Sequence, residues 1–362
     1  GVKQVFGERH DNGFRIFMAD KLRLAMTSQL YVGNHSDGNI LREILEKVDL
    51  SRLHTLSLHI MQDLETVATA FAKLPTPTHN LQKLNLTGLL SKDSESHFLS
   101  LFTSLRDAPL RTLTLSLPHP NPKENPKATW RFPSTWPTLR TVHLGRKDAF
   151  DHLFLSNLQE AAPNLESVRT ITYEWDVTTL AQSTLRTITF GPHITTQTLH
   201  LPTTTWSNLT KLAISGEYLE RLVDHLGTNK PVLPALQYLF MIGGDMQYLE
   251  DVMQKSGGRD VGFPSLSYLH LRFSICDLEG LIRCLNTYLM GLDIFVGYFA
   301  EPPYEEMAAR GGWNPLEGVR EWEGAIRGRC KVGKIKIVVC DVPERYGVEE
   351  VAVGDVEAEV EV

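Results

Sequence analysis

A six-residue phrase of the form L-x-x-L-x-L recurs along the chain and limits its possible folds more than any other feature. The copies at 110–115, 139–144 and 185–190 read LRTLTL, LRTVHL and LRTITF. With other apolar residues allowed in place of leucine, eleven copies begin at positions 53, 81, 110, 139, 168, 185, 209, 236, 266, 289 and 332. Their spacings are 28, 29, 29, 29, 17, 24, 27, 30, 23 and 43 residues. A period in the twenties predicts an array of structural repeats.

Each copy predicts a short β-strand, and the segments between copies predict helices. On a strand, positions 1, 4 and 6 of the phrase would point into the core, and positions 3, 5 and 7 would point to the opposite face. Apolar residues at helical spacing follow over 63–74, 97–105, 217–226 and 277–285, and residues 39–50 read as the outer helix of the first repeat. Residues 194–206 look extended instead.

Neither a strand nor a helix of such a unit can bury its apolar side alone. Stacked units would bury both, with the strands in one parallel sheet in sequence order. The predicted fold class is therefore α/β: an irregular solenoid with a parallel concave β-sheet, and with helices and extended segments on its convex side.

A proline precedes several phrases and gives the longer pattern P-x-L-x-x-L-x-L, as at 137–144, 234–241 and 264–271. The proline favours extended backbone before it and ends any preceding helix. This phrasing, with uneven repeat lengths, resembles the leucine-rich-repeat portion of fungal F-box proteins over roughly residues 50–300.

The resemblance implies a function as the substrate receptor of an F-box-type (SCF, cullin–RING) ubiquitin ligase. The concave face would hold the substrate, and a helical F-box before the repeats would bind the ubiquitin-ligase adaptor. Residues 1–52 lack the L-P-x-E-hydrophobic opening of an F-box, so an adaptor would need a missing N-terminal segment. The alternative is a leucine-rich-repeat scaffold or inhibitor protein with no ubiquitin role. We expect three regions: 1–52 as an N-terminal capping and first-repeat region, 53–296 as the solenoid, and 297–362 as an insertion, last repeat and acidic cap.

Composition narrows the partner class. The chain has 362 residues, a formal net charge of −7 and no run of basic residues, which argues against a nucleic-acid partner. The longest apolar stretch, 288–300, is too short to cross a membrane. The opening residues lack the apolar core of a signal peptide, and the four cysteines form no CxxC pair. We expect a cytoplasmic or nuclear protein that binds a protein partner, and neither nucleic acid nor membrane.

The residues expected on the concave face change along the array. Threonine and serine dominate positions 3, 5 and 7 up to the strand at 209, and larger side chains follow from 236. Aromatic residues and arginine are enriched at the centres of protein interfaces. The candidate partner-binding residues are Tyr238, Phe240, Tyr268, His270, Arg272, Asp293 and Phe295. In the alternative interpretation, residues 297–331 fold over these side chains as an end cap.

Catalytic chemistry is not expected. His270 and Asp293 would stand in one column on adjacent strands, about 5 Å apart, but the nearest serine on that face, Ser215, is two strands away. His59 and His143 would be three strands apart, too far to share a metal ion. No phosphate-binding, nucleophile-elbow or zinc-protease motif occurs. We therefore predict a non-enzymatic chain without cofactor or metal, and a capping strand with one acidic face within residues 349–362.

Overall fold

The computed structural model is an α/β structure in which parallel strands follow one another in sequence order. It describes residues 2–6, 27–32, 38–60, 64–73, 80–88, 94–116, 132, 135–145, 157–158, 160–170, 184–190, 206–226, 232–243, 246–273, 278–300 and 315–340. The chain divides into two compact units within the repeat array. Unit 1 comprises residues 1–185 and 198–200, and unit 2 comprises residues 186–197 and 201–362.

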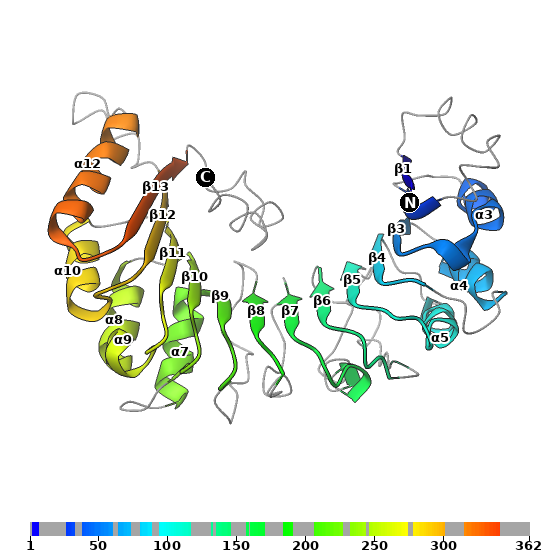
Figure 1. The fold of residues 1–362 in the computed structure, drawn as a ribbon, viewed down its shortest axis with the longest axis horizontal. Helices are drawn as coiled ribbons and strands as arrows, with labels where there is room; N and C mark the ends of the chain where they lie inside the picture. The colour runs from blue at the N-terminus through cyan, green and yellow to red at the C-terminus, as the bar shows by residue number, and fades with distance from the viewer. Residues whose placement is uncertain are drawn as a thin grey trace, which may run out of the picture. The chain divides into compact units, whose positions relative to one another are not determined.

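Unit 1 contains seven described strands, each paired in parallel with its neighbours in the chain (Figure 1). They are β1 (Val2–Phe6), β2 (Thr27–Val32), β3 (Thr55–Ile60), β4 (Lys83–Gly88), β5 (Thr112–Ser116), β6 (Thr141–Leu144) and β7 (Ser167–Thr170). The described helices are α3 (Gly38–Lys47), α4 (Leu64–Ala72), α5 (Ser94–Ser104) and the 3-10 helix η1 (Leu50–Arg52). The prediction that residues 110–115 and 139–144 form neighbouring parallel strands is confirmed, because Thr112 stands opposite Thr141.

Unit 2 repeats this arrangement of parallel strands and helices. Its described strands are β8 (Thr187–Phe190), β9 (Lys211–Ser215), β10 (Tyr238–Ile242), β11 (Tyr268–Phe273), β12 (Ile294–Ala300) and β13 (Lys334–Cys340), again parallel and in order. Its described helices are α7 (Gly216–Leu226), α8 (Met246–Ser256), α9 (Gly258–Val261), α10 (Leu278–Tyr288) and α12 (Pro315–Arg329). In each unit the described helices lie on one side of the strands (Figure 1). We call the other side of the sheet the open face of that unit.

Burial alternates along the strands as the phrase requires. On β5, Leu113 and Leu115 at positions 4 and 6 are fully buried, whereas the threonines and the serine between and beside them are half-buried. The helices α4, α7, α8 and α10 also bury apolar side chains, so in each unit the core lies between the sheet and its helices. Unit 1 adds an aromatic cluster of Phe98, Phe102 and Phe132 around Trp136, whose Nε1 donates to the Leu105 carbonyl at 3.1 Å.

A tight turn precedes several strands and explains the recurring proline. In the sequence W-P-T-L, the Leu139 amide donates to the Trp136 carbonyl at 3.1 Å, and Pro137 occupies the second turn position, where its fixed φ is favourable. The same turn closes from Leu236 to Leu233 and from Leu266 to Phe263. The residue before the proline is buried, so the turn attaches each strand to the core.

Two of the eleven predicted phrases are out of frame by three residues: the one at 168 begins three residues too late, and the one at 289 three residues too early. Opposite Thr141 at position 3 stands Ser167, so the repeat begins at Leu165, and Thr170, predicted on the concave face, is buried. Opposite Tyr268 stands Ile294, so the repeat begins at Leu292 and not at Leu289. The physical reason is that positions 1 and 4 are both apolar and three residues apart, so a phrase shifted by three residues keeps a matching pair.

The N-terminal region extends the array further than the sequence indicated. β1 and β2 precede the first phrase at Leu53, and Leu30 and Val32 of β2 are buried like the later position 4 and 6 residues. The predicted helix over 39–50 is present as α3.

The described part of 297–331 does not form a cap over the candidate residues. Residues 297–300 belong to β12, and α12 lies beside α10, with the Asn286 side-chain amide donating to the Arg329 carbonyl at 2.9 Å (Figure 1). α12 is therefore the connecting helix of the last repeat. Residues 301–314, the predicted extended segment 194–205 and the acidic segment 349–362 lie outside the described residues.

Candidate functional site

The open face of unit 2 carries a group of ring side chains on two adjacent strands. Register places Tyr238 of β10 opposite Tyr268 of β11, and Phe240 opposite His270. The two tyrosine rings are 5.4 Å apart between centroids, and the Phe240 and His270 rings are 4.2 Å apart. These four residues form what we call the aromatic strip. Strand alternation produces it, since all four occupy positions 3 or 5 of their repeats.

The strip is exposed along one edge. Tyr238 is 39% exposed and Phe240 is half-buried, whereas Tyr268 and His270 are only 7% and 4% exposed. The strip thus presents Tyr238 and Phe240 to a partner, and Tyr268 and His270 support them from the next strand.

Asp293 and Phe295 do not belong to the strip, contrary to prediction. Phe295 stands beside Leu269 in the register and is fully buried in the core. Asp293 is exposed in the turn before β12, where its amide donates to the Ser267 carbonyl at 2.9 Å. Val296, not Asp293, stands opposite His270. The predicted cross-strand His–Asp pair is therefore wrong, and the three-residue shift in the phrase at 289 is its cause.

Two further side chains of β12 belong to the open face of unit 2, and the shifted frame did not predict them. Ile294, which is half-buried, and Val296, which is buried, lie opposite Tyr268 and His270 and continue the strip with aliphatic side chains. The signal was present in the sequence: Leu292 and Phe295 are three apart and match positions 1 and 4 as well as Leu289 and Leu292 do.

Cationic side chains lie around the strip. The Lys211 ammonium on β9 is 4.9 Å from the centre of the Tyr238 ring, a cation–π distance. Arg272 follows His270 at position 7 of β11, and Lys334 and Lys336 hold positions 3 and 5 of β13. Burial, and then the charges of Arg272 and Lys336, lower the pKa of His270 to about 3, so its imidazole is neutral at physiological pH.

The open face of unit 1 is polar in character. Threonine, serine and asparagine fill most of positions 3 and 5, as predicted from the sequence. Burial, with the charges of Arg169 and Lys83, lowers the pKa of His143 to about 4. The His59 ring nitrogen Nδ1 is 3.0 Å from the Thr87 hydroxyl, an ordinary cross-strand contact.

The groups considered for catalysis have structural roles. The Ser215 hydroxyl accepts from the Tyr218 amide at 3.3 Å, which makes Ser215 the N-cap of α7. Burial raises the pKa of the Cys284 thiol to about 12, so this cysteine is protonated and unreactive at neutral pH. Among the described residues, no three His, Cys, Asp or Glu side chains are grouped closely enough to hold a metal ion.

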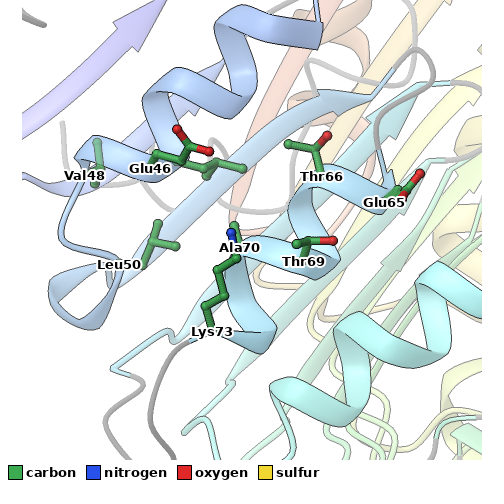
Figure 2. A pocket seen from close by; sticks show the side chains of 9 residues that line it. Glu46, Val48, Leu50, Glu65, Thr66, Thr69, Ala70 and Lys73 are labelled. Carbon is green, nitrogen blue, oxygen red and sulfur yellow. The ribbon is translucent and has the colours of Figure 1, made fainter.

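A hollow lies on the helix side of unit 1, between α3, η1 and α4 (Figure 2). Its volume is about 540 Å³, within the range of small-molecule sites. Leu45, Val48 and Leu50 form an apolar floor, and Glu46 and Glu65 lie at the rim. Its lining contains no histidine or cysteine, and its two carboxylates, Glu46 and Glu65, come from different helices. The hollow therefore offers less recognition chemistry than the aromatic strip.

No model of a known protein family matches the chain, and a search of curated proteins finds no significant sequence match. Within the described residues, no helix combines the length and apolar character needed to cross a membrane.

Proposed function

We propose that the chain is a leucine-rich-repeat solenoid that works as a non-enzymatic protein-binding module. Its partner docks on the open face of unit 2, centred on the aromatic strip and Arg272. The observation that carries this proposal is the exposed edge of Tyr238 and Phe240 beside a cationic neighbour. The described helices of this unit lie on the other side of the sheet and leave that edge uncovered.

Interface energetics support this choice of face. An aromatic side chain can bury on the order of 150–250 Å², far more than a threonine, and aromatic and arginine side chains dominate the binding energy of protein interfaces. Tyr268 and His270 are already packed, so Tyr238 and Phe240 would be held in position before the partner arrives. Prior ordering lowers the entropy lost on binding.

The narrower role rests on the resemblance to fungal F-box proteins. In that role the chain is the substrate-recognition part of a ubiquitin ligase receptor, and the partner on the open face is a substrate. The alternative is a scaffold or inhibitor with no ubiquitin role. An adaptor protein and cullin that co-purify with the full-length natural protein would favour the receptor, and their absence from a complex that still holds the partner would favour the scaffold.

Affinity capture with matched variants tests the binding face. The tagged chain, Tyr238→Ala, Arg272→Ala and the control Tyr248→Ala would each capture proteins from a cell extract for quantitative mass spectrometry. Tyr248 lies on α8, on the helix side of the same unit. We expect one set of proteins to be retained by the wild type and the control and lost from both open-face variants. Equal capture by all four chains would exclude this face as the binding site.

A further inference from the structure

The charged side chains of unit 2 are sorted between the two sides of its sheet. On the helix side, cations stand in ion pairs with acids of neighbouring helices: Lys255–Glu220 at 2.7 Å, Arg283–Glu250 at 2.9 Å and Arg329–Glu279 at 2.5 Å. On the open face, positions 3, 5 and 7 of β9 to β13 contain four cations and no aspartate or glutamate. The four cations are Lys211, Arg272, Lys334 and Lys336.

The excess of cations on the open face is not a consequence of the composition of the chain, which is acidic overall. The sequence has 43 acidic and 36 basic residues, so a face chosen at random would contain carboxylates. Four cations at these strand positions, with no aspartate or glutamate among them, create a positive potential, which attracts a partner of negative charge and repels basic ones. The low pKa of His270 agrees with such a potential, because the charges of Arg272 and Lys336 contribute to it.

The cations and the apolar side chains have a definite geometry. Lys211 stands on β9 at one margin of the strip, and Lys334 and Lys336 stand on β13 at the other. With about 4.8 Å between strands, four strand spacings put these margins about 19 Å apart. Tyr238, Phe240 and the β12 side chains lie between them. An extended peptide advances about 3.3 Å per residue, so carboxylates about six residues apart can reach both margins.

We propose that the open face of unit 2 binds an acidic, extended segment of a partner protein, whose carboxylates flank aliphatic or aromatic side chains. One carboxylate contacts Lys211, another contacts Lys334 or Lys336, and the apolar side chains between them cover Tyr238 and Phe240. This inference rests on the proposed function, because it gives the chemistry of the partner that the same face would bind.

A displayed library of random 12-residue peptides tests the inference with the full chain. The library is selected in parallel on the wild type, Lys334→Glu, Lys336→Glu and the control Arg320→Glu. All three variants reverse one exposed charge, but Arg320 lies on α12, on the helix side. We expect the peptides selected by the wild type and the control to contain at least about twice the aspartate and glutamate of the input library.

One selected peptide is then synthesised and its dissociation constant measured by fluorescence anisotropy. We expect Lys334→Glu and Lys336→Glu to weaken it about tenfold each, a loss of about 1.4 kcal/mol, and Arg320→Glu to leave it within about twofold. Raising the salt concentration from about 0.15 to 0.5 M should weaken binding to the wild type as well, because salt screens exposed charges.

Three results would contradict the proposed binding of an acidic partner segment. Selection without a bias toward acids, or binding that survives both lysine reversals, overturns the inference. If affinity capture still depends on Tyr238 in that case, the proposed function stands and only the partner's chemistry is wrong. If acidic peptides are selected only after Glu357, Glu359 and Glu361 are changed to Gln, the chain's own acidic segment occupies the face, and the assignment to an external partner fails.

Discussion

The leucines at position 4 of the phrase are the residues on which the fold depends most directly. Leu113 of unit 1 and Leu212 of unit 2 are almost completely buried. We predict that Leu113→Ala and Leu212→Ala each lower the free energy of unfolding by about 2–5 kcal/mol, through lost burial and the cavity left behind. Urea denaturation measures the change. Thr112→Ala, one position away on the same strand but on the open face, is the control and should stay within about 1 kcal/mol of the wild type.

Substitution of Phe295 distinguishes the two possible frames of β12, in which the repeat begins at Leu292 or at Leu289. In the structure its side chain is fully buried beside Leu269, so Phe295→Ala should cost about 3–5 kcal/mol of stability. A phenylalanine on the open face would lose far less on substitution. A change of less than about 1 kcal/mol in the urea experiment would mean that the repeat begins at Leu289 after all.

The two buried histidines predict how stability depends on pH. The pKa values of His143 and His270 fall from the ordinary 6.5 to about 4 and about 3 in the folded chain. Above pH 6.5 both imidazoles are neutral in the folded and unfolded chains and contribute nothing. As the pH falls below 6.5, the unfolded chain binds protons that the folded chain does not bind. The free energy of unfolding therefore decreases, down to about pH 4 through His143 and down to about pH 3 through His270.

Urea denaturation at pH 7 and pH 5 tests this dependence. His143→Gln and His270→Gln should each lose less stability between the two pH values than the wild type does, since glutamine does not titrate. Parallel losses in all three chains would show that neither imidazole resists protonation in the folded state.

At the scale of single elements, much of the fold could be predicted because its signals are local. Residues 53–58 and 110–115 predict strands by alternation, and residues 63–74 and 217–226 predict helices by spacing; the structure contains all four as β3, β5, α4 and α7. The frame of a repeat is harder to predict than the type of element, since apolar positions 1 and 4 are interchangeable in a short phrase. For the repeat at 165 the proline turn resolves the frame, because Pro163 stands two residues before Leu165, as Pro137 does before Leu139. Before Leu292 the corresponding residue is Met290, so that repeat lacks this signal.

The candidate site was predictable only in part, for the same reason. The prediction that Tyr238, Phe240 and Arg272 lie on the open face is correct, because the phrases at 236 and 266 are in the frame that the structure shows. Phe295 was assigned to that face only by the shifted frame. The burial of Tyr268 and His270 could not be predicted, because it depends on how neighbouring rings on β10 pack, and no single strand's pattern contains that information.

Two glycines with positive φ, Gly258 at the start of α9 and Gly243 directly after β10, should respond differently to substitution by alanine. Gly258 has a φ of +62°, and a Cβ there would lie 2.5 Å from the Tyr288 carbonyl oxygen. Gly243 has a similar φ of +70° but no atom within 4 Å of that position. Gly243→Ala should therefore cost only the strain of a left-handed alanine, about 1–2 kcal/mol, and Gly258→Ala clearly more. Thermal denaturation compares the two; equal losses would mean that the backbone at Tyr288 moves freely aside.

At the scale of the whole molecule, the strand positions that form the core are distinct from those that form the open faces. Apolar positions of the strands β2 to β12 build the core, and the open faces differ in chemistry: hydroxyl-rich in unit 1, aromatic and cationic in unit 2. Most position 3 residues, such as Lys83, Thr112 and Tyr238, are not buried, so they can vary with function without disturbing the core. This division underlies the proposal that unit 2 binds the partner.

Hydroxyl-radical footprinting, with and without a captured partner, tests the central claim most directly. In the free chain, Tyr238 (39% exposed) and Met290 (53% exposed) should react, and the buried Met241 and Phe295 should be protected. On partner binding, Tyr238 should become protected while Met290, outside the proposed site, continues to react. Unchanged reactivity of Tyr238 in the complex, or reaction of Met241 and Phe295 in the folded free chain, would contradict the assigned faces and the binding site built on them.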